Sequence, residues 1–178
     1  MALVAFLRGV NVGGHRSFRP TRLASDLRHL DAVNIGAAGT LVIRRRISRA
    51  QLRTEIASRL PFDTGIMICR GSDVADLHRH NPFAGQPSGP DIVRFVSVLA
   101  RRPRALPPLP LYLPSRANWL VKVLAYDAPF VLGLYRRQMR AITCLGQLDR
   151  RFEGPLTTRN WNTIGAIAGI LGATGATS

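Results

Sequence analysis

The pattern of apolar and polar residues predicts four strands and two helices in the first half of the chain. Short, strongly apolar runs of four to six residues are typical of strands in a sheet core. Such runs predict strands at Ala2–Leu7, Ala32–Ile35, Thr40–Arg44 and Ile66–Arg70. Apolar residues at helical spacing predict one helix from Pro20 (Leu23, Leu27, Leu30) and one capped by Ser48 (Leu52, Ile56, Leu60).

The order strand, helix, strand, strand, helix, strand is the ferredoxin-like plan. The right-handed crossover rule then predicts both helices on one face of a four-stranded sheet. Ser72 is expected to cap a short third helix that ends near Asn81-Pro82-Phe83. The Gly- and Pro-rich stretch 84–90 is a candidate linker between a lobe at 1–83 and a lobe at 91–178, unless both form one compact domain.

The second half of the chain is predicted to be rich in strands. Asp91–Ala100 alternates over a long stretch, and Trp119–Tyr126 and Phe130–Arg136 are expected to form a hairpin around Pro129. Residues 138–152 are predicted to be one helix, with Ile142, Leu145 and Leu148 facing inward. The fold class expected for the whole chain is therefore α+β, a ferredoxin-like lobe followed by a strand-rich lobe with closing helices.

The stretch Thr157–Thr163 carries six polar side chains and one Trp in seven residues. The pattern predicts that Thr158 caps the last helix, with Arg159 and Asn162 on its polar face and Asn160 partly buried. A helix N-terminus beside an arginine can bind an anion. An equally economical interpretation is a capped helix with a structural asparagine and a Trp anchor.

Charge adds a second indication of anion binding. The chain has 25 basic and 10 acidic residues, a formal net charge of +15, and Lys122 is its only lysine. Codon usage can explain the preference for arginine, but it does not explain the excess of positive charge. That excess favours anionic partners such as phosphorylated metabolites or nucleic acid. The sequence shows neither a targeting leader nor a membrane-spanning run, and its two cysteines are isolated, so a cytoplasmic location is expected.

The loop after the first strand is rich in glycine. Gly9 and Gly14 have the four-residue gap of a P-loop, but His15-Arg16 stands where Lys-Ser or Lys-Thr is required. What remains is a glycine turn at the end of a strand, where main-chain N–H groups can approach an anion. Its glycines are also consistent with a tight connection that has no ligand.

Three stretches together carry a family resemblance: Arg8–Gly14, Asn81-Pro82-Phe83 and Thr157–Thr163. In this order and spacing the chain resembles the bacterial family catalogued as domain of unknown function 1697. The resemblance implies an α+β protein with two sub-lobes, and it implies no substrate or cofactor. Many members have Ser-Gly-Asn between strands two and three, where this chain has Ala38-Gly39-Thr40.

The main functional hypothesis is that both termini face one cleft between the lobes, which binds a small anionic or phosphorylated ligand. The candidate ligand-binding residues carry guanidinium, amide, hydroxyl or bare main-chain groups: Arg8, Asn11, Gly13, Gly14, Thr158, Arg159, Asn160 and Asn162. Such groups suit binding better than acid–base catalysis. The sequence therefore leaves catalysis, cofactor and oligomeric state open, and it shows no metal-ligand spacing.

Two alternatives remain. The first is a nucleic-acid partner, bound through phosphate contacts with Arg44-Arg45-Arg46, Arg49 and Arg53 or with Arg136, Arg137 and Arg140. The first and third strands have almost no rings, which argues against base stacking there. The second is an assembly protein that associates through the Gly165 and Gly169 face of its last helix.

Overall fold

The protein is an α+β structure with two antiparallel sheets. The computed structural model describes residues 1–12, 14 and 16–173. These residues form two compact units, each with one sheet: the first takes the described residues of 1–80 and 162–178, and the second takes 81–161. Within the described residues, no helix is long and apolar enough to cross a membrane.

The first unit contains a four-stranded sheet in the order β2-β3-β1-β4, and every neighbouring pair is antiparallel. Its elements are, in chain order, β1 (Leu3–Leu7), α1 (Pro20–Asp26), the 3-10 turn η1 (Arg28–Leu30), β2 (Ala32–Ile35), β3 (Thr40–Ile43), α2 (Arg49–Ala57), β4 (Ile66–Arg70) and α3 (Gly71–His80). The strands lie where the sequence predicts them, to within one residue at each end.

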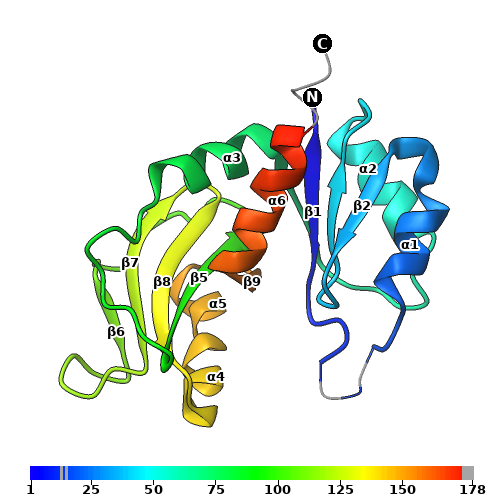
Figure 1. The fold of residues 1–178 in the computed structure, drawn as a ribbon. Coiled ribbons are helices and arrows are strands. Elements are labelled where there is room, and N and C mark those ends of the chain that lie inside the picture. The colour runs from blue at the N-terminus through cyan, green and yellow to red at the C-terminus, as the bar shows by residue number, and fades with distance from the viewer. Residues whose placement is uncertain (13, 15, 174–178) are drawn as a thin grey trace. The chain divides into compact units, whose positions relative to one another are not determined.

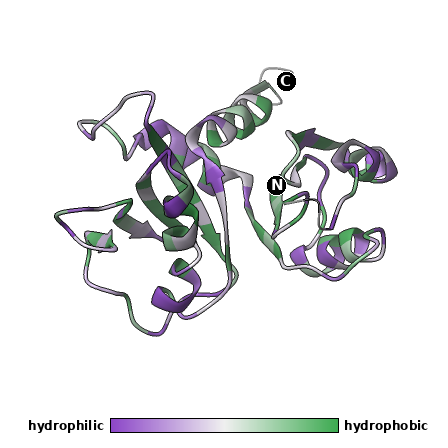
Figure 2. Cartoon of the chain, turned by 90° about the horizontal axis from the view of Figure 1, so that it is seen from below, coloured by the Kyte–Doolittle hydropathy of each residue, from purple (hydrophilic) through white to green (hydrophobic). Residues whose placement is uncertain are grey.

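One core lies between this sheet and its first two helices. Leu3, Ala5 and Leu7 of β1 cluster with Leu23 of α1 and with Ile56 of α2, so both helices cover the same sheet face (Figure 1). The helices of the first unit carry hydrophobic and hydrophilic colour side by side (Figure 2), as amphipathic helices do. This arrangement agrees with the predicted order of elements, and the ferredoxin-like name stays a prediction.

Two of the three predicted helix starts in this unit are confirmed. Pro20 occupies the first turn of α1, and Ser48 caps α2 in a capping box with Gln51. The predicted Ser72 cap is wrong, because α3 begins at Gly71, directly after β4. A Cβ at Gly71 would lie 2.9 Å from the Leu171 side chain of α6 (Trp161–Ala173), so the close approach of α6 decides this helix start.

The second unit contains a five-stranded antiparallel sheet in the order β6-β7-β8-β5-β9. Its elements are β5 (Ile92–Leu99), β6 (Leu111–Leu113), β7 (Val121–Asp127), β8 (Phe130–Arg136), α4 (Met139–Leu145), α5 (Leu148–Arg151) and β9 (Leu156–Asn160). The predicted hairpin is confirmed as β7 and β8, which pair from Val121–Tyr135 to Asp127–Phe130 with a bulge between. The sequence did not predict the short strand β6, which lies in the proline-rich stretch 103–114.

The single helix predicted at residues 138–152 is in fact two helices. The chain leaves α4 at Gly146 and re-enters a helix at Leu148. Ala141 and Cys144 are buried, while Ile142, predicted to face inward, is 61% exposed. Leu148 is buried as predicted.

The largest correction concerns the stretch at Thr157. The predicted cap Thr158 lies inside strand β9, which pairs with β5, and α6 begins only at Trp161 (Figure 1). The hydroxyls of Ser97 and Thr158 lie 2.6 Å apart across the two strands. Two β-branched threonines suit a strand, and β5 supplies the pairing that the local sequence does not show. Asn160, predicted to be partly buried, is exposed, whereas Arg159, predicted to lie on a polar face, is buried.

Candidate anion-binding site

The glycine loop between β1 and α1 is held in shape by Asn11. Its Nδ2 donates to the carbonyl of Ala37 at 2.8 Å, and its Oδ1 accepts the main-chain N–H of Phe18 at 2.9 Å. Asn11 itself has a φ of 54°, a left-handed conformation that asparagine tolerates better than most residues. Both ends of the side-chain amide therefore organise the loop.

The other predicted loop residues differ in what the structure shows of them. Arg8 is exposed, and its main chain joins the loop to the start of β4, through Gly65 at 2.9 Å and through the Thr64 hydroxyl. The carbonyl of Gly14 accepts a hydrogen bond from the Ser17 hydroxyl at 3.2 Å. Gly13, together with His15, lies outside the described residues.

The neighbouring turn between β2 and β3 requires its glycine. Gly39 has a φ of +75°, and a Cβ there would lie 2.8 Å from the Cβ of Leu7. The main-chain N–H of Leu7 donates to the Gly39 carbonyl at 2.8 Å. Thr40, which stands where many family members have asparagine, is fully buried. This turn therefore packs against the end of β1 and supplies the Ala37 carbonyl that orients Asn11.

A cavity of about 490 Å³ opens where the loop runs into α1. Apolar side chains form one part of its wall, and charged side chains form the other. The lining residues are Ser17, Phe18, Arg19, Arg22, Leu23, Asp26, Arg59 and Pro61. The Phe18 ring packs edge-on against Phe62 with centroids 5.9 Å apart. Phe18, whose main-chain N–H donates to the Asn11 side chain, is thus part of the cavity wall.

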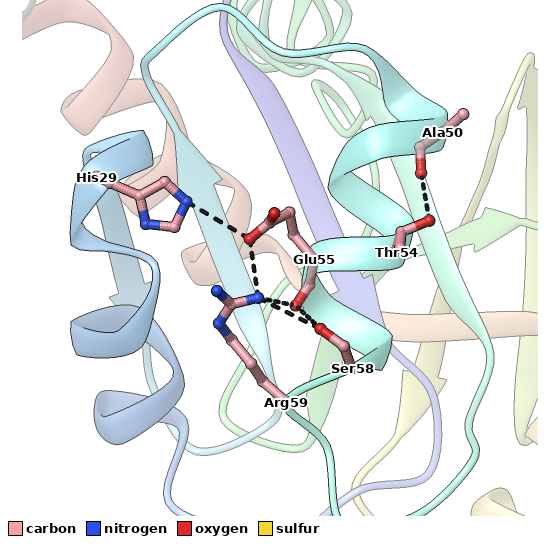
Figure 3. A network of polar contacts seen from close by, with 6 residues as sticks. All are labelled: His29, Ala50, Thr54, Glu55, Ser58 and Arg59. Carbon is pink, nitrogen blue, oxygen red and sulfur yellow. Dashed lines mark hydrogen bonds and ion pairs between the residues drawn. The ribbon is translucent and has the colours of Figure 1, made fainter.

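The three arginines of this cavity differ in their partners. Arg59 is held by Glu55, four residues before it, in an ion pair at 2.8 Å, and Glu55 also lies 3.4 Å from His29 (Figure 3). Arg19 and Arg22 form no ion pair with any described residue. Asp26 is the carboxylate among the described lining residues, so positive charge predominates.

This cavity was missed by sequence reasoning. A usable signal was present, because Arg19 and Arg22 are three residues apart at the start of a helix and therefore share a face. Position 59 could not be joined to them without the fold. The glycines shape the loop, whereas the arginines that follow it line the cavity.

Arg159 of β9 is a buried arginine with a perturbed pKa. It is 7% exposed, and its Nη1 donates to the Thr157 hydroxyl and to the Thr158 carbonyl, both at 2.9 Å. Burial lowers its pKa to about 10. The glycine loop belongs to the first unit and β9 to the second, so the cleft predicted between them stays a prediction.

The cysteines offer no reactive thiol at this site. Both are buried and free, and burial, reinforced by Asp73, raises the pKa of Cys69 to about 12. A thiol with such a pKa is a poor nucleophile at neutral pH. Within the described residues, no three His, Cys, Asp or Glu side chains gather as metal ligands.

Comparison with known proteins yields a similar solved structure and a matching family model. The solved structure of the conserved bacterial protein SP0830 from Streptococcus pneumoniae is similar, with a TM-score of 0.61 over 96% of this chain and 98% of that one. At 14% identity this likeness concerns the fold alone. No curated protein matches the chain. The family model described as "Protein of unknown function (DUF1697)" matches residues 1–106, which include the glycine loop, the cavity residues and Asn81–Phe83, and the chain belongs to this family.

Proposed function

We propose that the protein binds a small anionic or phosphorylated ligand that also has an apolar part. The observation that carries the proposal is the cavity beside the glycine loop, where two arginines that have no carboxylate partner among the described residues adjoin an apolar wall. A guanidinium group donates two parallel hydrogen bonds to a phosphate or a carboxylate. Phe18, Leu23 and Pro61 would contact the rest of the ligand.

Arg59 has a different part in this proposal. Its guanidinium is tied to Glu55, to the Glu55 carbonyl at 2.8 Å and to the Ser58 hydroxyl at 3.3 Å (Figure 3). These bonds fix its position and offset part of its charge. We assign the direct contacts with the anion to Arg19 and Arg22, and to Arg59 the shaping of the wall.

Asn11 acts in this proposal as a positioning residue. The Asn11 side chain holds the main chain of Phe18 and is itself fixed by the Ala37 carbonyl. Loss of this side chain would therefore loosen the Phe18 part of the cavity wall and leave the arginines in place. Ligands bind more tightly to a site that is already ordered. We therefore expect Asn11→Ala to weaken binding less than loss of either arginine.

The test is a thermal-shift titration of the full chain with inorganic phosphate, pyrophosphate and a panel of phosphorylated and carboxylated metabolites. A ligand that binds the folded state raises the melting temperature as its concentration passes the Kd. We expect Arg19→Gln and Arg22→Gln each to remove most of this rise and to leave the melting temperature without ligand unchanged. The double variant Arg45→Gln/Arg46→Gln changes two exposed arginines elsewhere in the first unit and should respond as the wild type does. An equal response of the wild type and both cavity variants would contradict the proposal.

We extend the proposal to Arg8, Thr158, Arg159, Asn160 and Asn162 as further ligand-binding residues. If Arg159 contacts the ligand, Arg159→Met should reduce the ligand-dependent rise in melting temperature. An unchanged rise would remove Arg159 from the ligand-binding residues. We assign no catalytic role to this cavity.

A further inference from the structure

A second group of positive charges in the protein is combined with aromatic rings. It lies in the second unit, at the edge of the sheet formed by β6, and it involves β6, β7, β8 and the loop after β6. We call it the ring–cation edge, and it consists of Tyr112, Arg116, Trp119, Lys122 and Arg136.

Each ring of this edge has a cation above it. The guanidinium of Arg136 lies 4.2 Å from the centroid of the Trp119 ring. Arg116 and Lys122 lie 5.8 Å and 5.6 Å from the centroid of Tyr112. Tyr112 and Lys122 are directly paired across β6 and β7, so the sheet register itself holds this ring and this cation together.

Arg136 is oriented as well as charged. Its Nε donates to the carbonyl of Trp119 at 3.0 Å, and its main-chain N–H donates to the carbonyl of Leu120 at 2.8 Å. Among the described residues its terminal nitrogens have no hydrogen-bond partner. The fork of this guanidinium is thus fixed on the indole with its two donating ends available.

The charge of this edge is not neutralised within the described part of the chain. Arg116, Lys122 and Arg136 form no ion pair there. Arg116 is exposed, and the other four residues are half-buried, so the surface is accessible but ordered. Three uncompensated cations on a protein with a net charge of +15 favour a partner with several negative charges.

We propose that the ring–cation edge binds single-stranded nucleic acid. Cations that track phosphates, combined with rings or guanidinium planes on which bases stack, are the two components of single-strand recognition. A duplex keeps its bases stacked on each other and would use only the cations. The rings therefore favour a single strand over a duplex.

The test is the binding of fluorescein-labelled 20-mers of uridine and of thymidine to the full chain, measured by fluorescence anisotropy between 50 and 200 mM KCl. We expect single strands to bind at low salt and a 20-base-pair duplex to bind more weakly. The double variant Arg116→Gln/Lys122→Gln should lower the slope of log K against log salt by about 1.4, because each phosphate contact contributes about 0.7. The matched double variant Arg45→Gln/Arg46→Gln removes equal charge from the first unit and should leave that slope unchanged.

The rings are tested separately from the charge. Trp119→Ala should weaken single-strand binding by about 5- to 150-fold without changing the salt slope, since it removes a stacking surface. Tyr112→Leu provides the same test if the Trp119 variant does not fold by circular dichroism. The proposal is overturned if the wild type binds no oligonucleotide at 50 mM KCl, if both double variants lose affinity equally, or if a duplex binds as well and the ring variants have no effect.

Discussion

The glycine loop and the Thr157–Asn160 stretch both carry predicted ligand-binding residues, yet their polar side chains end in opposite environments. In the loop, asparagine is fixed by the main chain, and the arginines that follow stay at the surface of a cavity. In β9, arginine is buried and asparagine is exposed. Residue type alone therefore does not decide which polar group meets solvent.

Backbone geometry explains the difference. The loop takes left-handed φ angles at Gly9, Asn11, Gly14 and Arg16, which a strand does not use. Strand β9 alternates its side chains between two faces of a sheet, so Arg159 must follow Thr157 into a buried layer. The loop needs unusual dihedral angles, whereas the strand has to accommodate a charge in an apolar setting.

The largest expected effect comes from the glycine that supports the loop. Gly39→Ala would combine a left-handed conformation with a Cβ 2.8 Å from Leu7, so we expect about 3 kcal/mol of destabilisation in urea unfolding. Gly36→Ala is the matched control, because its φ is +64° but nothing lies within 4 Å. It should cost about 1 kcal/mol. Equal costs would mean that packing against Leu7 contributes nothing.

The next effect tests whether Asn11 is structural. Asn11→Ala leaves the Phe18 N–H and the Ala37 carbonyl without this partner, and we expect a loss of about 2 kcal/mol. Asn11→Gly removes the same bonds but relieves the left-handed backbone, and should lose about 1 kcal/mol less. In β9 the exposed Asn160 directly precedes α6, and Asn160→Ala should lose about 1 kcal/mol. A larger loss for Asn160 than for Asn11 would reverse the comparison.

The third effect concerns the buried arginine, and its sign is unusual. Arg159→Met keeps the apolar length of the side chain and removes the charge, so we expect stability to stay equal or to rise by about 1 kcal/mol. A loss of several kcal/mol would instead show that the charge is needed for folding. Urea unfolding at pH 7 distinguishes these results.

The stability of the wild type relative to Arg159→Met is expected to depend on pH. The pKa of Arg159 is about 10 in the folded state against an ordinary 12.5, so the unfolded chain holds this proton more tightly. The penalty of the buried charge is fully present below pH 10 and is relieved as the pH rises above it. The wild type should therefore gain stability relative to Arg159→Met between pH 9 and about 11, measured as the difference between their unfolding curves. A constant difference would indicate that the folded-state pKa is not lowered.

The strands and first helices could be predicted because their signals are local. Ser48 meets Gln51 three residues later, and the buried Leu52 and Ile56 repeat within α2, so nothing distant has to be known. The start of α6 could not be predicted in this way. Thr158 looks like a helix cap until β5, 61 residues away, pairs with it as a strand.

The candidate site was predicted only in part for the same reason. The sequence indicated the glycine loop and an anionic ligand, and the structure adds the arginines beside it and a structural role for Asn11. The position of Arg59 in the cavity wall depends on how α2 lies against α1, which no local pattern carries. Likewise, Trp119 and Arg136 are ordinary residues of a hairpin until the register stacks one on the other.

The most direct test of the account is a phosphate titration followed through the Nε–H signals of the arginine side chains by nuclear magnetic resonance. Arg19→Gln and Arg22→Gln assign the two cavity signals, and Arg45→Gln and Arg46→Gln assign two exposed controls. If phosphate binds in the cavity, the signals of Arg19 and Arg22 should shift together and saturate, while the signals of Arg45 and Arg46 should shift little. Equal shifts of all four, without saturation, would show general screening of surface charge and would contradict an anion site in the cavity.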